Sequence, residues 1–127
     1  IVLPQGVKRE TFEAAQKLIL EMVGDISEDI VIQGSRVAGT ARENSDIDIA
    51  IRVSLDKFDN LISKSFKTPH KGSAKEKTML HAIKTGKIQA GEAGLRSLRK
   101  ELERIFGFEV DISIIKKGGA FILQIVY

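Results

Sequence analysis

Hydrophobic residues recur along the chain with two different spacings, and each spacing predicts one kind of element. Spacings of three and four are typical of a helix with one buried face. They fall at residues 7–23, 55–66, 73–84 and 92–106. Ser54 is placed to cap the second of these helices, and Ser73 with Glu76 forms a capping-box pattern at the start of the third. Glycines follow three of the helices, at positions 24, 86 and 107, as is common where helices end.

Strict alternation of hydrophobic and polar residues predicts a strand at residues 46–53. One face would carry Ile47, Ile49, Ile51 and Val53, and the other would carry Asp46, Asp48, Ala50 and Arg52. Shorter apolar runs at 30–32 and 110–115 predict two further strands. This order of helices and strands indicates an α/β (α+β) domain with helices packed on one small mixed sheet.

The C-terminal segment is less regular. Gly118 and Gly119 predict a turn, and residues 121–126 fit either a final strand or a tail.

Composition narrows the class of protein. The chain has 127 residues, of which 43% are hydrophobic and 29% charged, and this predicts one globular domain over 1–127 rather than a disordered chain. Cysteine is absent, which excludes disulfides, thiolate metal sites and cysteine catalysis. No apolar run approaches the roughly 20 residues that span a membrane, and no signal peptide is visible. Because the chain begins with Ile1, we expect it to be a piece of a longer polypeptide.

Charge is unevenly distributed along the chain, although the net charge is only +3. Residues 1–56 carry 6 basic and 10 acidic side chains, whereas residues 57–104 carry 12 basic and 5 acidic ones. Seven lysines lie between residues 64 and 87 with Glu76 as the only acid among them. Such a concentration favours contact with a polyanion, the alternative being an ordinary solvated helix face. The segment has few aromatic residues, which favours recognition of a backbone over base stacking.

Three aspartates form the candidate chemical centre. Asp46 and Asp48 point to the same face of one strand, with Cα atoms roughly 6.5 Å apart. Asp111 lies on another strand and converges with them if the two strands are neighbours. Three carboxylates suit a hard cation such as Mg²⁺, which also binds substrate phosphates.

Gly34 and Ser35 follow the first strand directly and precede a short predicted helix. Glycine allows the backbone to approach a phosphate closely, and the serine hydroxyl and the helix start provide donors. The order Gly-Ser, ten residues, Asp-x-Asp and a third Asp on another strand is far more specific than any of its parts.

The run GSRVAGTARENSDIDIAIRV, together with Asp111, resembles the signature of the DNA polymerase β nucleotidyltransferase superfamily, in particular its minimal members. The resemblance implies a nucleotidyltransferase fold, with two Mg²⁺ ions and a nucleoside triphosphate as substrate. It implies that Asp46, Asp48 and Asp111 are the catalytic metal ligands and that Gly34 and Ser35 hold the triphosphate. It further implies a catalytic sheet over 30–53 and 108–115, with a helical, basic, acceptor-binding segment over 55–106.

Further candidate contacts to the nucleotide or RNA come from residue type and position. They are Arg36, Ser45, Lys75, Lys77, Lys84 and Lys87. Arg36 and Arg42 fit a phosphate contact, but an arginine at such a position is more often a surface cation, and Ser45 also fits shaping the turn into its strand. His70 and His81 have no spaced partners and are interpreted as surface or packing residues.

The stretch KGSAKEKTMLHAIKTGKIQAGEAGLRSLRKELE also resembles C-terminal toxin domains of bacterial polymorphic or contact-dependent growth inhibition systems. This resemblance implies a bacterial toxin that belongs to a secreted polypeptide, acts in the cytoplasm of a target cell and is bound by an acidic immunity protein. The preferred hypothesis is transfer of a nucleoside monophosphate to the end of tRNA or another RNA. The alternatives are a protein or small-molecule acceptor, as in antitoxin-type or aminoglycoside-type enzymes, or a catalytically inactive RNA-binding module.

Overall fold

The computed structural model describes residues 3–117 and 124–126, and for residues 124–126 it describes the backbone alone. The elements in chain order are α1 (Arg9–Val23), β1 (Ile30–Gln33), α2 (Ser35–Ala38), β2 (Ile47–Val53), α3 (Leu55–Phe66), α4 (Ala74–Thr85), β3 (Lys87–Gln89), α5 (Arg96–Phe106), β4 (Val110–Lys116) and β5 (Gln124–Val126). The predicted mixed α/β class is confirmed.

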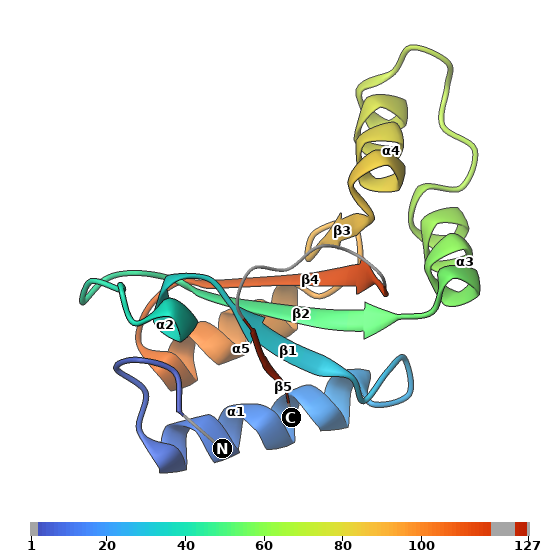
Figure 1. Cartoon of the computed structure of the whole chain (residues 1–127). Coiled ribbons are helices and arrows are strands. Elements are labelled where there is room, and N and C mark those ends of the chain that lie inside the picture. Colours follow the sequence, from blue (N-terminus) through green and yellow to red (C-terminus); the bar gives the residue numbers. More distant parts are fainter. Residues whose placement is uncertain (1–2, 118–123, 127) are drawn as a thin grey trace.

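The strands form one sheet in the order β3-β4-β2-β1-β5. The central pair β2 and β4 is parallel, and every other neighbouring pair is antiparallel. Helices α1 and α5 lie together on one face of this sheet (Figure 1). The predicted alternation of β2 is confirmed, because Ile47, Ile49, Ile51 and Val53 are all buried in the main core. The opposite face of the sheet has only a small buried apolar cluster, formed by Val31, Ala50 and Ile115.

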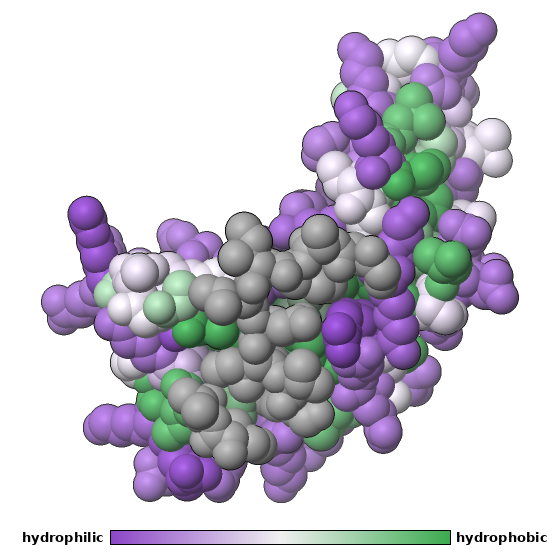
Figure 2. Space-filling view, viewed as in Figure 1, coloured by the Kyte–Doolittle hydropathy of each residue, from purple (hydrophilic) through white to green (hydrophobic). Residues whose placement is uncertain are grey.

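Helices α3 and α4 pack against each other and project from the sheet (Figure 1). We call residues 55–85 the arm. Both helices begin at the predicted serine caps: the Ser54 hydroxyl accepts from the Lys57 amide, and the Ser73 hydroxyl accepts from the Glu76 amide. The Glu76 carboxylate in turn accepts from the Gly72 amide, one residue before the position that a capping box specifies. Figure 2 shows mainly hydrophilic residues on the arm, with an apolar strip along it.

Two sequence predictions in this region are wrong. The segment 55–106 is not purely helical, because residues 87–89 form the edge strand β3 and pair with β4. The last long helix begins at Arg96 instead of residue 92, because Gly94 has a φ of +75° and breaks the helical path. The predicted turn at Gly118 and Gly119 lies outside the described residues. Of the two readings of the C-terminal segment, the strand is confirmed for Gln124–Val126.

No helix in residues 3–117 and 124–126 is long and apolar enough to cross a membrane.

Candidate active site

The parallel pairing of β2 with β4 brings two of the three predicted acids together. Asp48 and Asp111 are register partners across these strands. Their side chains point to the face of the sheet opposite α1 and α5, because both neighbours of each, Ile47 and Ile49 or Val110 and Ile112, are buried in the main core. The condition set by the sequence, that the two acidic strands be neighbours, is therefore met.

Asp48 has a strongly perturbed carboxyl group. Its partial burial, the nearby charges of Asp46 and Asp111 and a hydrogen bond to Asp111 raise the pKa of Asp48 to about 6, and Lys87 opposes the rise. Like charges that lie this close either share a proton or need a cation between them. A bound cation would therefore stabilise the ionised form of Asp48.

These acids fit a divalent metal ion in their donor chemistry. Asp48 and Asp111 present carboxylate oxygens beside each other, and Asp46, one residue before β2, is near enough to raise the pKa of Asp48. Oxygen donors of this kind are what Mg²⁺ prefers. In the part of the chain that the structure describes, however, no three acidic or imidazole groups are already gathered closely enough to form a complete ligand set.

The turn after β1 lies directly against Asp48. Gly34 has a φ of +91°, and a Cβ atom there would lie 2.5 Å from Asp48 Oδ2. The turn continues into α2, where the amides of Val37 and Ala38 bond back to the Gly34 carbonyl. Glycine is therefore needed at this position for two reasons, its backbone conformation and its contact with the carboxylate.

Replacing Gly34 by alanine is expected to destabilise the fold by about 1–3 kcal/mol and to displace the Asp48 carboxylate, so that any activity that depends on this carboxylate falls with it. The matched control is Gly39→Ala, because Gly39 also has a positive φ, of +78°, but its added Cβ would meet no atom within 4 Å. Thermal unfolding and activity of the two variants check this. If both variants lost activity in the same proportion to their loss of stability, the contact with Asp48 would have no separate role.

Arg36 is corrected by the structure as a candidate nucleotide contact. Its side chain is only 4% exposed. The guanidinium donates to the backbone carbonyls of Gln5, Glu43 and Ser45 and stacks 3.7 Å from the centroid of the Phe108 ring. Because these donors are used inside the protein, Arg36 fixes the loop between α2 and β2 and is not placed to bind phosphate.

Ser45 belongs to the same loop. Its hydroxyl accepts from the Arg42 amide at 2.8 Å, which is the turn-shaping role that the sequence left open as an alternative. Its contact with nucleotide stays a prediction.

The candidate lysines are distributed over a long distance. Lys87 lies at the site, with its ammonium nitrogen 3.8 Å from Asp111 Oδ2. Lys84 is exposed in the last turn of α4. Lys75 and Lys77 are exposed near the start of α4, and about 15 Å of helix separates Lys75 from Thr85 at its other end. The structure brings Lys87 to the acids and leaves Lys75 and Lys77 on the distal part of the arm.

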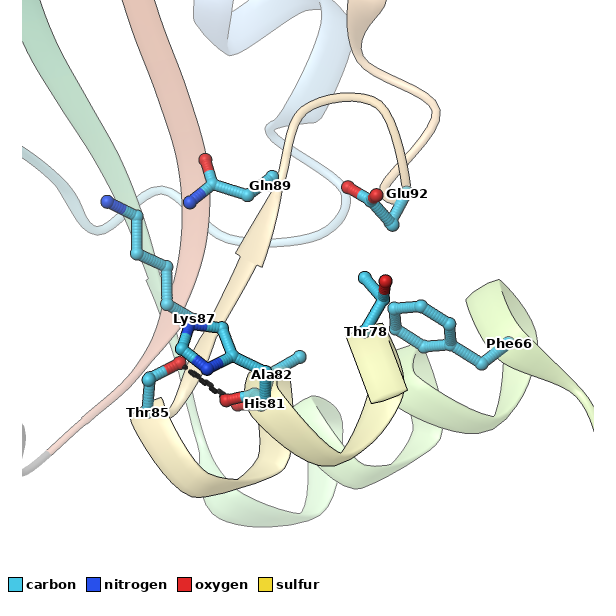
Figure 3. Close-up of a pocket in the computed structure, with 8 residues that line it drawn as sticks. All are labelled: Phe66, Thr78, His81, Ala82, Thr85, Lys87, Gln89 and Glu92. Carbon is cyan, nitrogen blue, oxygen red and sulfur yellow. Dashed lines mark hydrogen bonds between the residues drawn. The ribbon is translucent and has the colours of Figure 1, made fainter. Parts of the chain in front are cut away.

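A pocket beside Lys87 was not predicted from the sequence. It is lined by residues of α3, α4, β3 and the following loop, among them His81, which the sequence had marked as a surface or packing residue (Figure 3). No sequence signal pointed to it, because its position depends on the three-residue strand β3, which is too short for a periodic pattern.

Comparison with known proteins places this arrangement in context. The family model described as a nucleotidyltransferase domain matches residues 13–126. Separate searches of curated proteins and of solved structures returned no match to the chain.

Proposed function

The chain belongs to the nucleotidyltransferase domain family, whose general activity is nucleotidyl transfer, and from this premise we propose that its acceptor is the end of tRNA or another RNA. The observation that carries the proposal is the meeting of Asp48, Asp111 and the Gly34 turn on one face of the sheet, in a domain that also carries a lysine-rich arm.

The acids would work as a unit with bound magnesium. Two Mg²⁺ ions, held by Asp46, Asp48 and Asp111, would supply positive charge that neutralises the triphosphate and the departing pyrophosphate. The Gly34 turn supports this assignment, because it allows the backbone and the neighbouring Ser35 hydroxyl to approach a phosphate beside Asp48. The protein's own contribution is mainly alignment and fixed charge.

The proposed reaction balances as a substitution at phosphorus. An acceptor hydroxyl oxygen forms a bond to the α-phosphorus, and the bond from that phosphorus to the oxygen bridging to the β-phosphate breaks. The electron pair of this bond leaves with pyrophosphate. Asp111, on the acceptor side, receives the hydroxyl proton.

The arm supports an RNA acceptor by its charge. The lysines at 64, 67, 71, 75, 77 and 84 are all exposed. The only acid among them, Glu76, is engaged by the Gly72 amide at the start of α4. An exposed cationic surface of this kind attracts a phosphate backbone without reading its sequence.

The biological setting we propose is a bacterial toxin that blocks translation inside a target cell, with an acidic immunity protein covering the basic surface. The support for this part is the resemblance of residues 71–103 to delivered toxin domains and the cationic arm.

The test of the proposed function is a labelling experiment. The protein is incubated with Mg²⁺, total tRNA and each of the four labelled nucleoside triphosphates in turn. We expect label in RNA with at least one nucleotide, and none with the Asp46→Ala, Asp48→Ala double variant. Label in a protein band instead of RNA would decide for a protein acceptor. RNA binding that ignores Mg²⁺ and the loss of the three aspartates, without any labelling, would indicate an inactive binding module.

A further inference from the structure

A pocket lies where α4 meets β3, and Lys87 and Gln89 of β3 line it (Figure 3). Both side chains point to the face of the sheet that carries Asp111, because Ile88 between them is buried in the main core, just as Asp111 alternates with the buried Ile112. The cavity volume is about 260 Å³. This is slightly below the usual range for small-molecule sites, so it suits one planar ring better than a whole nucleotide.

Lys87 connects the pocket to the acid pair. Its side chain lines the pocket, and its ammonium nitrogen lies 3.8 Å from Asp111 Oδ2. A group seated in the pocket is therefore separated from Asp111 by a single side chain. Since Asp111 is the carboxylate proposed to face the acceptor hydroxyl, the neighbouring pocket is positioned for the acceptor and not for the triphosphate, which would lie at the Gly34 turn.

The lining combines an apolar base with a polar rim. Phe66 and Ala82 are both buried and form the apolar part. The rim carries Thr78, His81, Thr85, Gln89 and Glu92. The Thr78 and Thr85 hydroxyls already donate to the Ala74 and His81 carbonyls, which leaves His81, Gln89 and Glu92 as the rim side chains for a ligand. Glu92 comes from the loop after β3 and Thr78 from α4, and both line the pocket (Figure 3).

Glu92 decides the chemistry of the occupant. Its negative charge repels a phosphate, so the phosphates of an RNA would stay outside, near Lys84 and Lys87. A carboxylate accepts hydrogen bonds well from an amino group, and Gln89 both donates and accepts. A neutral heterocycle with an amino group on its edge satisfies the apolar base and this rim together.

We propose that this pocket holds the nucleobase of the acceptor's terminal nucleotide, with Glu92 accepting from the exocyclic amino group. The inference rests on the proposed RNA acceptor. Adenine, cytosine and guanine carry such an amino group, whereas uracil has none and offers only its ring N3–H, between two carbonyl oxygens that Glu92 repels. The terminal ribose of an RNA bound in this way lies between the pocket and Asp111.

The first experiment compares two RNAs that differ only in ending with adenosine or uridine. We expect the wild-type protein to prefer the adenosine end by about tenfold in kcat/KM. Glu92→Ala should remove most of this preference by raising KM for the adenosine-ended RNA, with KM for the nucleoside triphosphate unchanged. Glu13→Ala, at an exposed position on α1, is the matched control and should keep the preference. An unaltered preference in Glu92→Ala overturns the proposal.

The second experiment needs neither metal nor nucleoside triphosphate. The dinucleotides ApA and UpU are titrated into the Asp48→Asn variant, and amide chemical shifts are followed by NMR. ApA should shift the signals of His81, Lys87 and Gln89 at concentrations where UpU does not. Equal shifts with both, or shifts only elsewhere, overturn the pocket assignment. Absence of labelled RNA in the transfer assay overturns the proposed function separately, because this titration still reports on the pocket.

Discussion

Asp48→Asn is expected to lower nucleotidyl transfer by about a thousandfold, the scale seen when a charge-stabilising group is removed from a reaction centre. Asp48 is the side chain on which the site converges: it pairs in register with Asp111, and the Gly34 turn is packed against it. Asparagine keeps the size and removes the charge. Single-turnover rates with saturating Mg²⁺ measure the loss. The exposed Asp25→Asn is the control and should retain full activity.

The same substitution should stabilise the metal-free protein at neutral pH. The pKa of Asp48 is raised in the folded state to about 6 from its ordinary value of 3.8. The folded state thus binds this proton more tightly than the unfolded state. The protonated Asp48 carboxyl therefore adds fully to the free energy of unfolding below pH 4, and this contribution is lost as pH rises through 6. Asparagine does not ionise, so the variant keeps this stability at neutral pH.

Because Asp48 is only half-buried, solvent screening reduces the effect to about 1 kcal/mol, or about 4 °C in Tm. Thermal melts of wild type and Asp48→Asn at pH 4.5 and 7.5, in chelator, give the difference directly. A variant that is less stable than wild type at pH 7.5 would show that repulsion between the carboxylates does not destabilise the folded protein.

Arg36→Met should destabilise the protein by about 3–5 kcal/mol, a loss large enough to unfold many domains of this size. The buried guanidinium serves three backbone carbonyls, and methionine fills the space without replacing any donor. Urea unfolding measures the change. Arg42→Met, in the same loop but exposed, should change stability by no more than about 0.5 kcal/mol. If the two variants unfolded alike and Arg36→Met weakened only triphosphate binding, the role as a nucleotide contact would return.

Much of the fold was predictable because its strongest elements carry local patterns. The alternation in β2 and the serine caps of α3 and α4 depend on neighbouring residues only, and the structure has them as expected. The start of α5 was missed because the left-handed conformation of Gly94 is not written in the helical spacing that surrounds it.

The site was only partly predictable, for a different physical reason. Residue types and spacing identified Asp48 and Asp111, but their contact depends on a parallel pairing between strands that lie far apart in the chain. Arg36 was misjudged because a sequence does not show which arginine will find carbonyls in the interior. The pocket at β3 also needs tertiary structure, since its walls come from two helices and an edge strand.

The arm is held at both ends by the same end of β4. The Lys117 amide bonds to the Val53 carbonyl before the arm, and the Lys116 amide bonds to the Gly86 carbonyl after it. Phe58, Ile62, Phe66 and Ala82 anchor the arm in the main core, whereas the connection between α3 and α4 lies beyond these residues. The cost of closing a loop grows only slowly with its length, so this connection can be lengthened or shortened while the acids keep their register. If the arm holds the acceptor, as proposed, changes in this connection would alter acceptor binding without altering Asp48 and Asp111.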